Sequence, residues 1–288
     1  MPARVKRIPY DLSALETVTL ESGLPRMQDE ASELTAGLST EQLIAMATGD
    51  PAKGQGSALG SAGVSVPGSA GETSSCAIEQ GIANIVLADG PAGLRLNQKY
   101  YVRNGKAALL PFEASVEHGL FYEGTGNEGQ PRYQFCTAIP VGTLLAQSWD
   151  EALLEIYLRG FEIAIAESHP YAMMTSYNLL NGIHTANSYD LCTRIAREEF
   201  GFDGFIMTDW TTTEQGDDCT AAGCILAGND MVMPGQYSDH ESIRQALQSG
   251  VLSEERLRAC IERIVRVILK SDRYEKTRQT QKLEQLRY

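Results

Sequence analysis

The sequence predicts an α/β fold built on parallel strands. Short apolar runs alternate along the chain with longer segments that have helical apolar spacing, and such alternation is typical of a parallel sheet. Three of the apolar runs lead directly to a polar or aromatic residue, at residues 82–88, 172–175 and 205–207. Because chemistry in α/β barrels gathers where strands end at their carboxyl side, residues following these runs are candidates for a functional site.

The remaining elements are assigned from caps, apolar spacing and loop composition. Residues 1–38 are polar and mixed, and residues 49–75 are rich in Gly, Ser, Ala and Pro, which predicts a loop. Residues 97–135 are predicted to form a long excursion of the kind that carries binding loops. Helices are predicted at 40–46 after Ser39, 153–167, 190–200, 220–227 and 254–268 after Ser253, with a last strand at 231–233.

Composition limits the class of protein. A chain of 288 residues with 43% hydrophobic residues can form one large domain or two small ones. Its net charge of −13 argues against nucleic-acid binding and is compatible with a neutral substrate. No membrane-spanning run or signal pattern is found, and the six cysteines show no metal-ligand spacing. We therefore expect reduced thiols, a cytoplasmic location, no membrane partner, no metal and no cofactor.

The stretch 201–210, Gly-Phe-Asp-Gly-Phe-Ile-Met-Thr-Asp-Trp, is the most informative segment. It predicts a short buried strand that presents Asp209 at its carboxyl end. A carboxylate next to an indole suits a sugar, because the acid can attack or stabilise an oxocarbenium-like centre and the ring can pack on a sugar face. The alternative, in which Asp209 only caps the next helix, stays open.

Three motifs in order carry a resemblance to the catalytic barrel of glycoside hydrolase family 3, which holds β-glucosidases and related exo-acting enzymes. They are residues 168–210, the Ala-Asp-Gly-Pro-Ala-Gly-Leu-Arg motif at 88–95, and Ala-Gly-Asn-Asp-Met-Val-Met-Pro-Gly at 227–235. The resemblance covers most of residues 60–272. It implies an N-terminal polar segment at 1–59, a shortened catalytic barrel at 60–272, and a charged tail at 273–288.

The resemblance also implies roles for four residues. Asp209 matches the nucleophile of a retaining double displacement, and Tyr177 matches a tyrosine that hydrogen-bonds the nucleophile. Asp89 matches an acceptor of sugar hydroxyls, and Trp210 matches an aromatic wall of the subsite. Simpler roles remain open: a turn residue for Asp89, an ordinary buried tyrosine for Tyr177, and core packing for Trp210. The implied substrate is a β-glucoside or oligosaccharide.

One interruption sets this chain apart from the family pattern. Residues 149–164 resemble two family segments joined directly, with no counterpart of the middle strands between them, near residues 150–153. The 190 residues from Ile82 to Ser271 compare with about 250 for a typical complete barrel. We therefore expect four or five parallel strands in an incomplete or shortened (β/α)8 barrel of the TIM type.

The interruption bears on activity. The family's Lys-His pair and Gly-Arg-Asn loop are absent, and its acid/base Glu often comes from a later domain. Glu214 is the nearest later carboxylate to Asp209, and it is better explained by solvation of a helix start. Two hypotheses follow: a β-glucosidase-like hydrolase, or a non-catalytic shortened barrel that binds sugar weakly or acts as an interaction or folding remnant. Exposed strand edges predict self-association, which could also complete the site.

Overall fold

A computed structural model describes most of the predicted α/β region. The described residues are 28–50, 66, 69–88, 94, 96, 99–103, 106–108, 132–133, 151–180, 182–214, 219–272 and 274. Asp89, residues 139–149 and, apart from residue 274, the expected tail at 273–288 lie outside them. Within them, no helix is long and apolar enough to cross a membrane.

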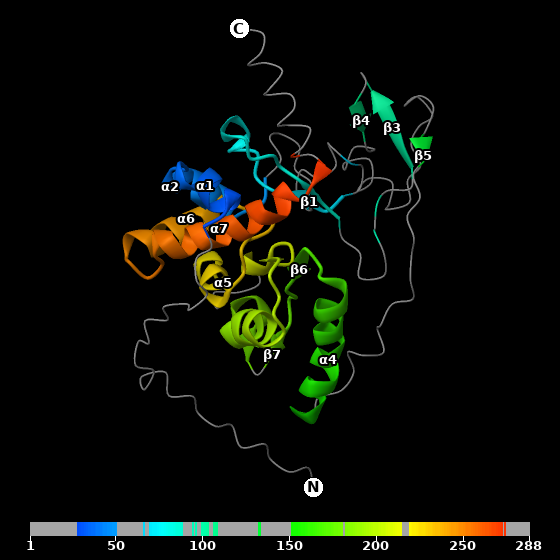
Figure 1. The fold of residues 1–288 in the computed structure, drawn as a ribbon, viewed down its shortest axis with the longest axis vertical. Coiled ribbons are helices and arrows are strands. Elements are labelled where there is room, and N and C mark those ends of the chain that lie inside the picture. The colour runs from blue at the N-terminus through cyan, green and yellow to red at the C-terminus, as the bar shows by residue number, and fades with distance from the viewer. Residues whose placement is uncertain are drawn as a thin grey trace.

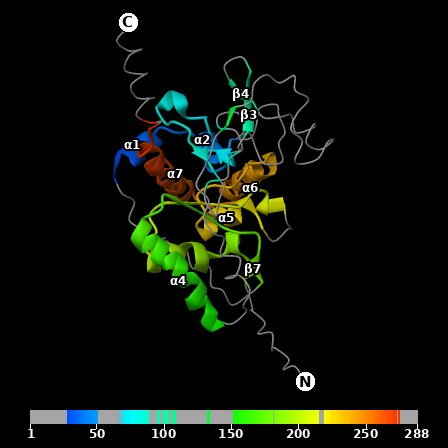
Figure 2. The same ribbon diagram turned by 90° about the vertical axis from the view of Figure 1, so that its right-hand side faces the viewer.

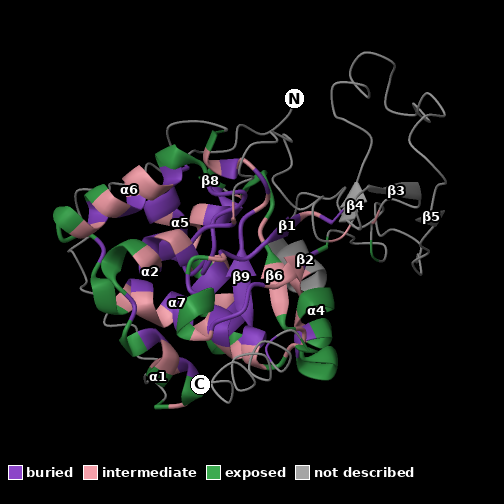
Figure 3. Cartoon of the chain, turned by 90° about the horizontal axis from the view of Figure 1, so that it is seen from above, coloured by how far each residue is buried: buried purple, intermediate pink, exposed green. Residues whose placement is uncertain are grey.

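Four chain segments lie parallel at the centre of the structure. Strand β6 (Ala172–Met174) pairs in parallel with β9 (Phe205–Met207). Bridges continue the parallel pairing from Met207 to Met231 and from Val232 to Thr48. The predicted strands at 172–175 and 205–207 are confirmed, and residues 231–232 occupy the place of the predicted last strand as bridges. The α/β fold is therefore present, with β6 and β9 at the centre of Figure 3.

The sheet is extended by two antiparallel steps. Gly49 pairs antiparallel with Thr73, and β1 (Gly71–Glu72) pairs antiparallel with β2 (Val86–Leu87). Two reversals return β2 to the direction of the parallel segments, so its carboxyl end lies at the same edge as that of β9. The prediction of a loop throughout 49–75 is wrong at β1. Glycine is required there for close packing, because a side chain at position 71 would clash with Met233 and Trp210. Of the strand predicted at 82–88, only Val86–Leu87 forms a strand, which is β2.

A layer of helices packs on this sheet, as Figures 1 and 2 show. It consists of α1 (Glu30–Ala36), α2 (Thr40–Met46), α5 (Ala221–Ala227), α6 (Tyr237–Gln248) and α7 (Glu254–Leu269). The predicted caps Ser39 and Ser253 are confirmed, since each accepts a hydrogen bond from the first turn of its helix. Thr220, predicted as the first residue of a helix, is instead the cap of α5 and accepts from the Gly223 main-chain N–H. Helix α7 contacts both α1 and α2, and its apolar face is buried. Helices α1 and α6 were missed.

Two further helices carry a second, smaller core. Helix α4 (Glu151–Ser168) and the π-helix η6 (Asp190–Glu199) confirm the helices predicted at 153–167 and 190–200. Ile165 of α4 packs with residues of η6 and with Ile206 of β9. Because α4 begins at Glu151, the expected join near residues 150–153 falls at the start of one continuous helix.

The connections contain more regular structure than their composition predicts. In the excursion predicted at 97–135, β3 (Lys99–Arg103) lies between β4 (Lys106–Ala108) and β5 (Arg132–Tyr133) in an antiparallel sheet. The hairpin of β7 (Leu179–Leu180) and β8 (Ile183–His184) follows β6. Among the residues that the structure describes there are also three short 3-10 turns: η3 (Ile78–Gln80), η5 (Thr185–Asn187) and η7 (Thr212–Glu214).

The described strands form an open arc. Pairing between them runs from β6 through β9, residues 231–232, residues 48–49 and β1 to β2. Across the part of the chain that is described, no pairing joins β6 to β2 to close a barrel. A closed barrel is therefore not observed, and the shortening of the family barrel stays a prediction.

Candidate active site

Asp209 lies two residues beyond the carboxyl end of β9, the strand between β6 and residues 231–232. All three residues of β9 are buried. The next residue, Thr208, is fully buried, and its main-chain N–H donates to the Met231 carbonyl oxygen at 3.0 Å. Its hydroxyl oxygen accepts a hydrogen bond of 2.9 Å from the main-chain N–H of Met233. The strand end that presents Asp209 is thus fixed to the neighbouring segment by both main chain and side chain.

The Asp209 side chain is partly exposed and held by the following turn. Its Oδ1 accepts a hydrogen bond from the Trp210 main-chain N–H at 2.7 Å. Its main-chain carbonyl accepts from the Thr212 hydroxyl at 2.9 Å, where η7 begins. Thr211 between them has a φ of 57°, in the left-handed region, which is uncommon for a residue other than glycine. Asp209 thus combines a local role at the start of a turn with an accessible carboxylate.

Tyr177 and Asp209 are brought together, as the resemblance implies. Tyr177 follows β6, and its hydroxyl donates to the Trp210 carbonyl oxygen at 2.6 Å. Burial, together with the negative charge of Asp209 and a hydrogen bond with it, raises the pKa of Tyr177 to about 12. A neutral phenol against a carboxylate can donate a hydrogen bond to it and hold it in place.

Trp210 lies in the core of this structure. Only 7% of the residue is exposed. A Cβ added to Gly71 would lie 3.0 Å from the Trp210 ring at Cζ2 and 2.5 Å from Cε of Met233, which shows how closely β1 passes beneath the indole. Core packing therefore describes Trp210 here, and the subsite wall stays a prediction.

The loop after Asp209 has supports that the sequence analysis did not identify. The Thr211 main-chain N–H donates to the Met233 carbonyl oxygen at 3.0 Å. The Thr213 hydroxyl donates to Oδ1 of Asp239 at 2.7 Å, while Oδ2 of Asp239 accepts from the Gln236 main-chain N–H at 2.8 Å. Asp239 belongs to the missed helix α6 and is only 2% exposed. Its distance of 26 residues from Thr213 left no local signal in the sequence.

The other predicted participants are placed only in part. Glu214 ends η7 and is exposed, which agrees with its interpretation as a solvated residue at a helical turn. Asp89 lies outside the described residues, so its predicted contact with sugar hydroxyls stays a prediction. In the regions searched, which are those the structure describes, no group of three or more His, Cys, Asp or Glu side chains could hold a metal ion.

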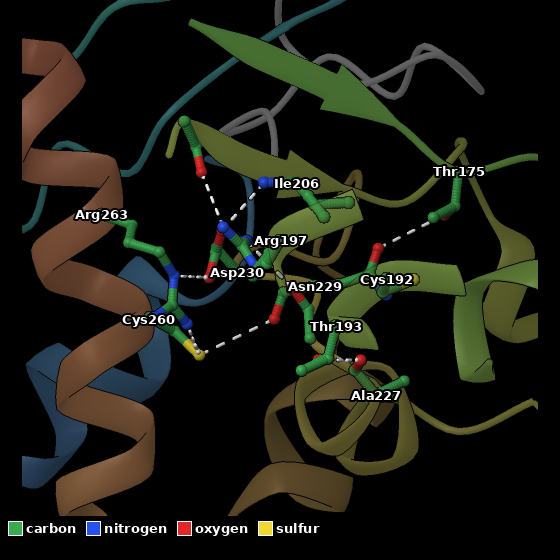
Figure 4. Close-up of polar contacts among 12 residues, drawn as sticks. Thr175, Cys192, Thr193, Arg197, Ile206, Ala227, Asn229, Asp230, Cys260 and Arg263 are labelled. Atoms are coloured by element: carbon green, nitrogen blue, oxygen red, sulfur yellow. Dashed lines mark hydrogen bonds and ion pairs between the residues drawn. The ribbon is translucent and has the colours of Figure 1, made fainter. Parts of the chain in front are cut away.

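A buried ion-pair cluster supports the strand that carries Asp209. Figure 4 shows Asp230 between Arg197 of η6 and Arg263 of α7. Oδ2 of Asp230 accepts from Arg197 Nη2 at 2.6 Å and from the Ile206 main-chain N–H at 2.8 Å, while Oδ1 accepts from Arg263 Nε at 2.7 Å. Asp230 is fully buried. The cluster ties two helices to β9, three residues before Asp209.

Comparison with known proteins identifies relatives of part of the chain. Residues 141–267 match the glycosyl hydrolase family 3 N terminal domain. A β-glucosidase from Ruminococcus albus is 41% identical over 127 residues, covering 42% of this chain and 13% of the relative. A β-glucosidase from Rhizobium radiobacter is 38% identical over 128 residues, covering 44% of this chain and 15% of the relative. The matched segment is thus a small part of these relatives.

A solved structure shows the same fold over a longer stretch. β-Glucosidase 3B from Thermotoga neapolitana, in complex with glucose, aligns with a TM-score of 0.59 at 23% identity. The alignment covers 87% of this chain and 44% of that one. The family match and the two relatives confirm the resemblance seen in the sequence motifs: residues 141–267, which carry Asp209, Tyr177 and Trp210, are related to the N-terminal domain of glycoside hydrolase family 3.

Proposed function

We propose that this chain supplies the nucleophile side of a glycoside hydrolase of the β-glucosidase type. Its substrate would be a terminal β-linked glucosyl or related residue of a glucoside or oligosaccharide. The observation that carries the proposal is the contact of Tyr177 with the Asp209 turn at the carboxyl end of β9. The names of the two relatives support the substrate class.

In the proposed mechanism, Asp209 acts as nucleophile in a retaining double displacement. Its carboxylate attacks the anomeric carbon while an acid protonates the leaving oxygen, giving a covalent glycosyl-enzyme that water then hydrolyses. Tyr177, which donates its hydroxyl proton to the Trp210 carbonyl oxygen, would hold the turn that presents the carboxylate to the sugar. Trp210 and Thr211 position the carboxylate through the turn that contains them.

The rest of the proposed site has to come from other groups. A retaining enzyme needs a second carboxyl group about 5–5.5 Å from the nucleophile, and Asp89 is proposed as a sugar-hydroxyl acceptor rather than as that acid. We expect the acid/base to come from outside the matched segment. The isolated chain should therefore react slowly with substrates whose leaving group needs protonation, and faster with activated aryl glucosides.

A mechanism-based fluorosugar tests the nucleophile without a complete site. An aryl 2-deoxy-2-fluoro-β-glucoside has a leaving group that needs little acid assistance, and its glycosyl-enzyme is slow to hydrolyse. We expect labelling of the tryptic peptide 198–244, localised by fragmentation to Asp209. Asp209→Asn should abolish the label, whereas the matched control Asp203→Asn, an exposed carboxylate on the same peptide, should keep it. Labelling at another carboxylate, or no labelling, would contradict the assignment.

A further inference from the structure

Two cysteines outside the candidate active site lie close enough to react with each other. The Sγ atoms of Cys219 and Cys224 are 3.9 Å apart. Cys219 is 2% exposed and Cys224 is fully buried, and neither forms a disulfide in this structure. Cys219 precedes the Thr220 cap of α5, and Cys224 lies in the middle of that helix. A disulfide needs the sulfur atoms to approach to about 2.05 Å, so the two sulfur atoms, now 3.9 Å apart, must move closer together.

Both thiols share one acceptor on a neighbouring turn. Oδ1 of Asn187 accepts from Cys224 Sγ at 3.0 Å and from Cys219 Sγ at 3.4 Å. Asn187 ends η5, and the packing is tight, because a Cβ added to Gly223 would lie 2.6 Å from Asn187 Nδ2. The two S–H donors thus help to hold η5 against the start of α5.

The turn η5 in turn holds the residues on either side of Tyr177. Thr185 begins η5, and its hydroxyl donates to the Ser176 carbonyl oxygen at 2.5 Å. Its main-chain N–H donates to the Asn178 carbonyl oxygen at 3.1 Å. A continuous set of contacts therefore leads from the cysteine pair through η5 to the tyrosine that faces Asp209.

We propose that Cys219 and Cys224 are a site of reversible oxidation, forming a disulfide in the presence of a hydroperoxide. Disulfide formation removes both S–H donors to Asn187 and pulls the start of α5 toward its middle. We infer that the contact between α5 and η5 loosens and that the segment around Tyr177 moves with it. The coupling to Tyr177 rests on the proposed function, whereas the disulfide itself does not.

The chemistry balances with a hydroperoxide as the only co-reactant. The sulfur of Cys219 attacks one peroxide oxygen, the O–O bond breaks, and a sulfenic acid and one water (or alcohol) form. The sulfur of Cys224 then attacks the sulfenic sulfur, so that the S–S bond forms, the S–O bond breaks, and the hydroxyl leaves with the thiol proton as water. Two thiols are oxidised and one O–O bond is reduced. A hydrogen bond with Cys219 and burial raise the pKa of the Cys224 thiol, which disfavours Cys224 as the first nucleophile.

Peptide mapping of the peroxide-treated chain tests the disulfide directly. No Lys or Arg lies between Glu198 and Arg244, so trypsin leaves both cysteines in one peptide. The native chain is treated with hydrogen peroxide, denatured, alkylated and digested. We expect this peptide to lose two hydrogen atoms and to escape alkylation, with full recovery of both thiols after dithiothreitol. Methionine oxidation adds oxygen and is not reversed by dithiothreitol, so the two changes are distinguishable.

Variants assign the reaction to this pair. Cys219→Ser and Cys224→Ser should each abolish the internal link, and Cys76→Ser, which removes an exposed thiol, should leave it unchanged. Because the pair is buried, we expect it to react more slowly than Cys76. The proposal is overturned if the native peptide stays fully alkylated once Cys76 has been oxidised, or if the link joins a different cysteine.

Hydrogen exchange then tests the coupling without using activity. Oxidation of the native chain should speed amide exchange within residues 175–187, and dithiothreitol should restore the original rate. The double variant Cys219→Ser/Cys224→Ser should show no such response to peroxide. A disulfide that forms without changing exchange in this segment would refute the coupling. Failure of the fluorosugar to label Asp209 would leave both of these results unaffected.

Discussion

Replacing Asp230 by Asn should destabilise the fold strongly, because this buried carboxylate balances one buried and one partly buried arginine. Only 3% of the Arg197 side chain and 18% of the Arg263 side chain are exposed. The substitution keeps the size of the side chain, removes the negative charge, and turns an amide N–H₂ toward one of three hydrogen-bond donors. Removing one partner of a buried ion pair costs about 3–5 kcal/mol. We expect a loss in the unfolding free energy within that range.

The loss of unfolding free energy expected for Asp230→Asn is larger than that expected for a matched variant in an exposed ion pair. Asp190 and Arg194 also form an ion pair, at 3.0 Å on the surface of η6, with side chains 70% and 67% exposed. Asp190→Asn should change the unfolding free energy by less than about 1 kcal/mol, because exposed pairs are screened by water. Urea unfolding of both variants and the native chain, followed by circular dichroism, measures the difference.

Two outcomes of the urea experiment decide the argument. A large decrease for Asp230→Asn with a small one for Asp190→Asn would support burial as the cause. Equal decreases in the two variants would refute it. If Asp230→Asn does not fold, Arg263→Lys provides a milder test, since it keeps the positive charge and removes the guanidinium hydrogen bond; this variant should lose part of the stability and still unfold cooperatively.

Three further predictions concern the candidate site and the packing beneath it. Gly71→Ala should destabilise the chain by about 1–3 kcal/mol through overpacking. Gly160→Ala, in open space on helix α4, should instead stabilise it by about 0.5–1 kcal/mol. If thermal unfolding finds the Gly71 variant more stable than the Gly160 variant, the packing argument is wrong. Asp209→Asn should lower the pKa of Tyr177 from about 12 toward its ordinary value of 10.0, and difference absorbance titration measures this change. Because the pKa of Tyr177 is raised in the folded state, the contribution of this group to stability is complete below pH 10 and is lost as the pH rises toward 12. Asp89→Ala should weaken glucose binding by about 1.5–3 kcal/mol through loss of a charged acceptor, and equal affinities by calorimetry would rule this role out.

The sequence predicted those parts of the fold that depend on local properties. The caps at Ser39 and Ser253 and the strand before Asp209 were correct, because hydroxyl caps and short apolar runs act over a few neighbouring residues. Helix α6 was missed because it is mostly polar and begins after Gln236, which is not a typical cap. Strand β1 was missed because glycine-rich composition predicts loops, whereas here Gly71 allows close packing.

For the candidate site, the sequence by itself predicted which residues would carry the chemistry, and the tertiary structure decided how these residues are held. Asp209 and Tyr177, 32 residues apart, were proposed from one motif at 168–210, and the parallel pairing of β6 with β9 brings them together. The burial of Trp210 and the Asp230 cluster appeared only in the structure. The burial of Trp210 and the Asp230 cluster both depend on contacts between segments that are distant in the chain. The energies of these contacts are set by packing and desolvation, which a local sequence pattern does not predict.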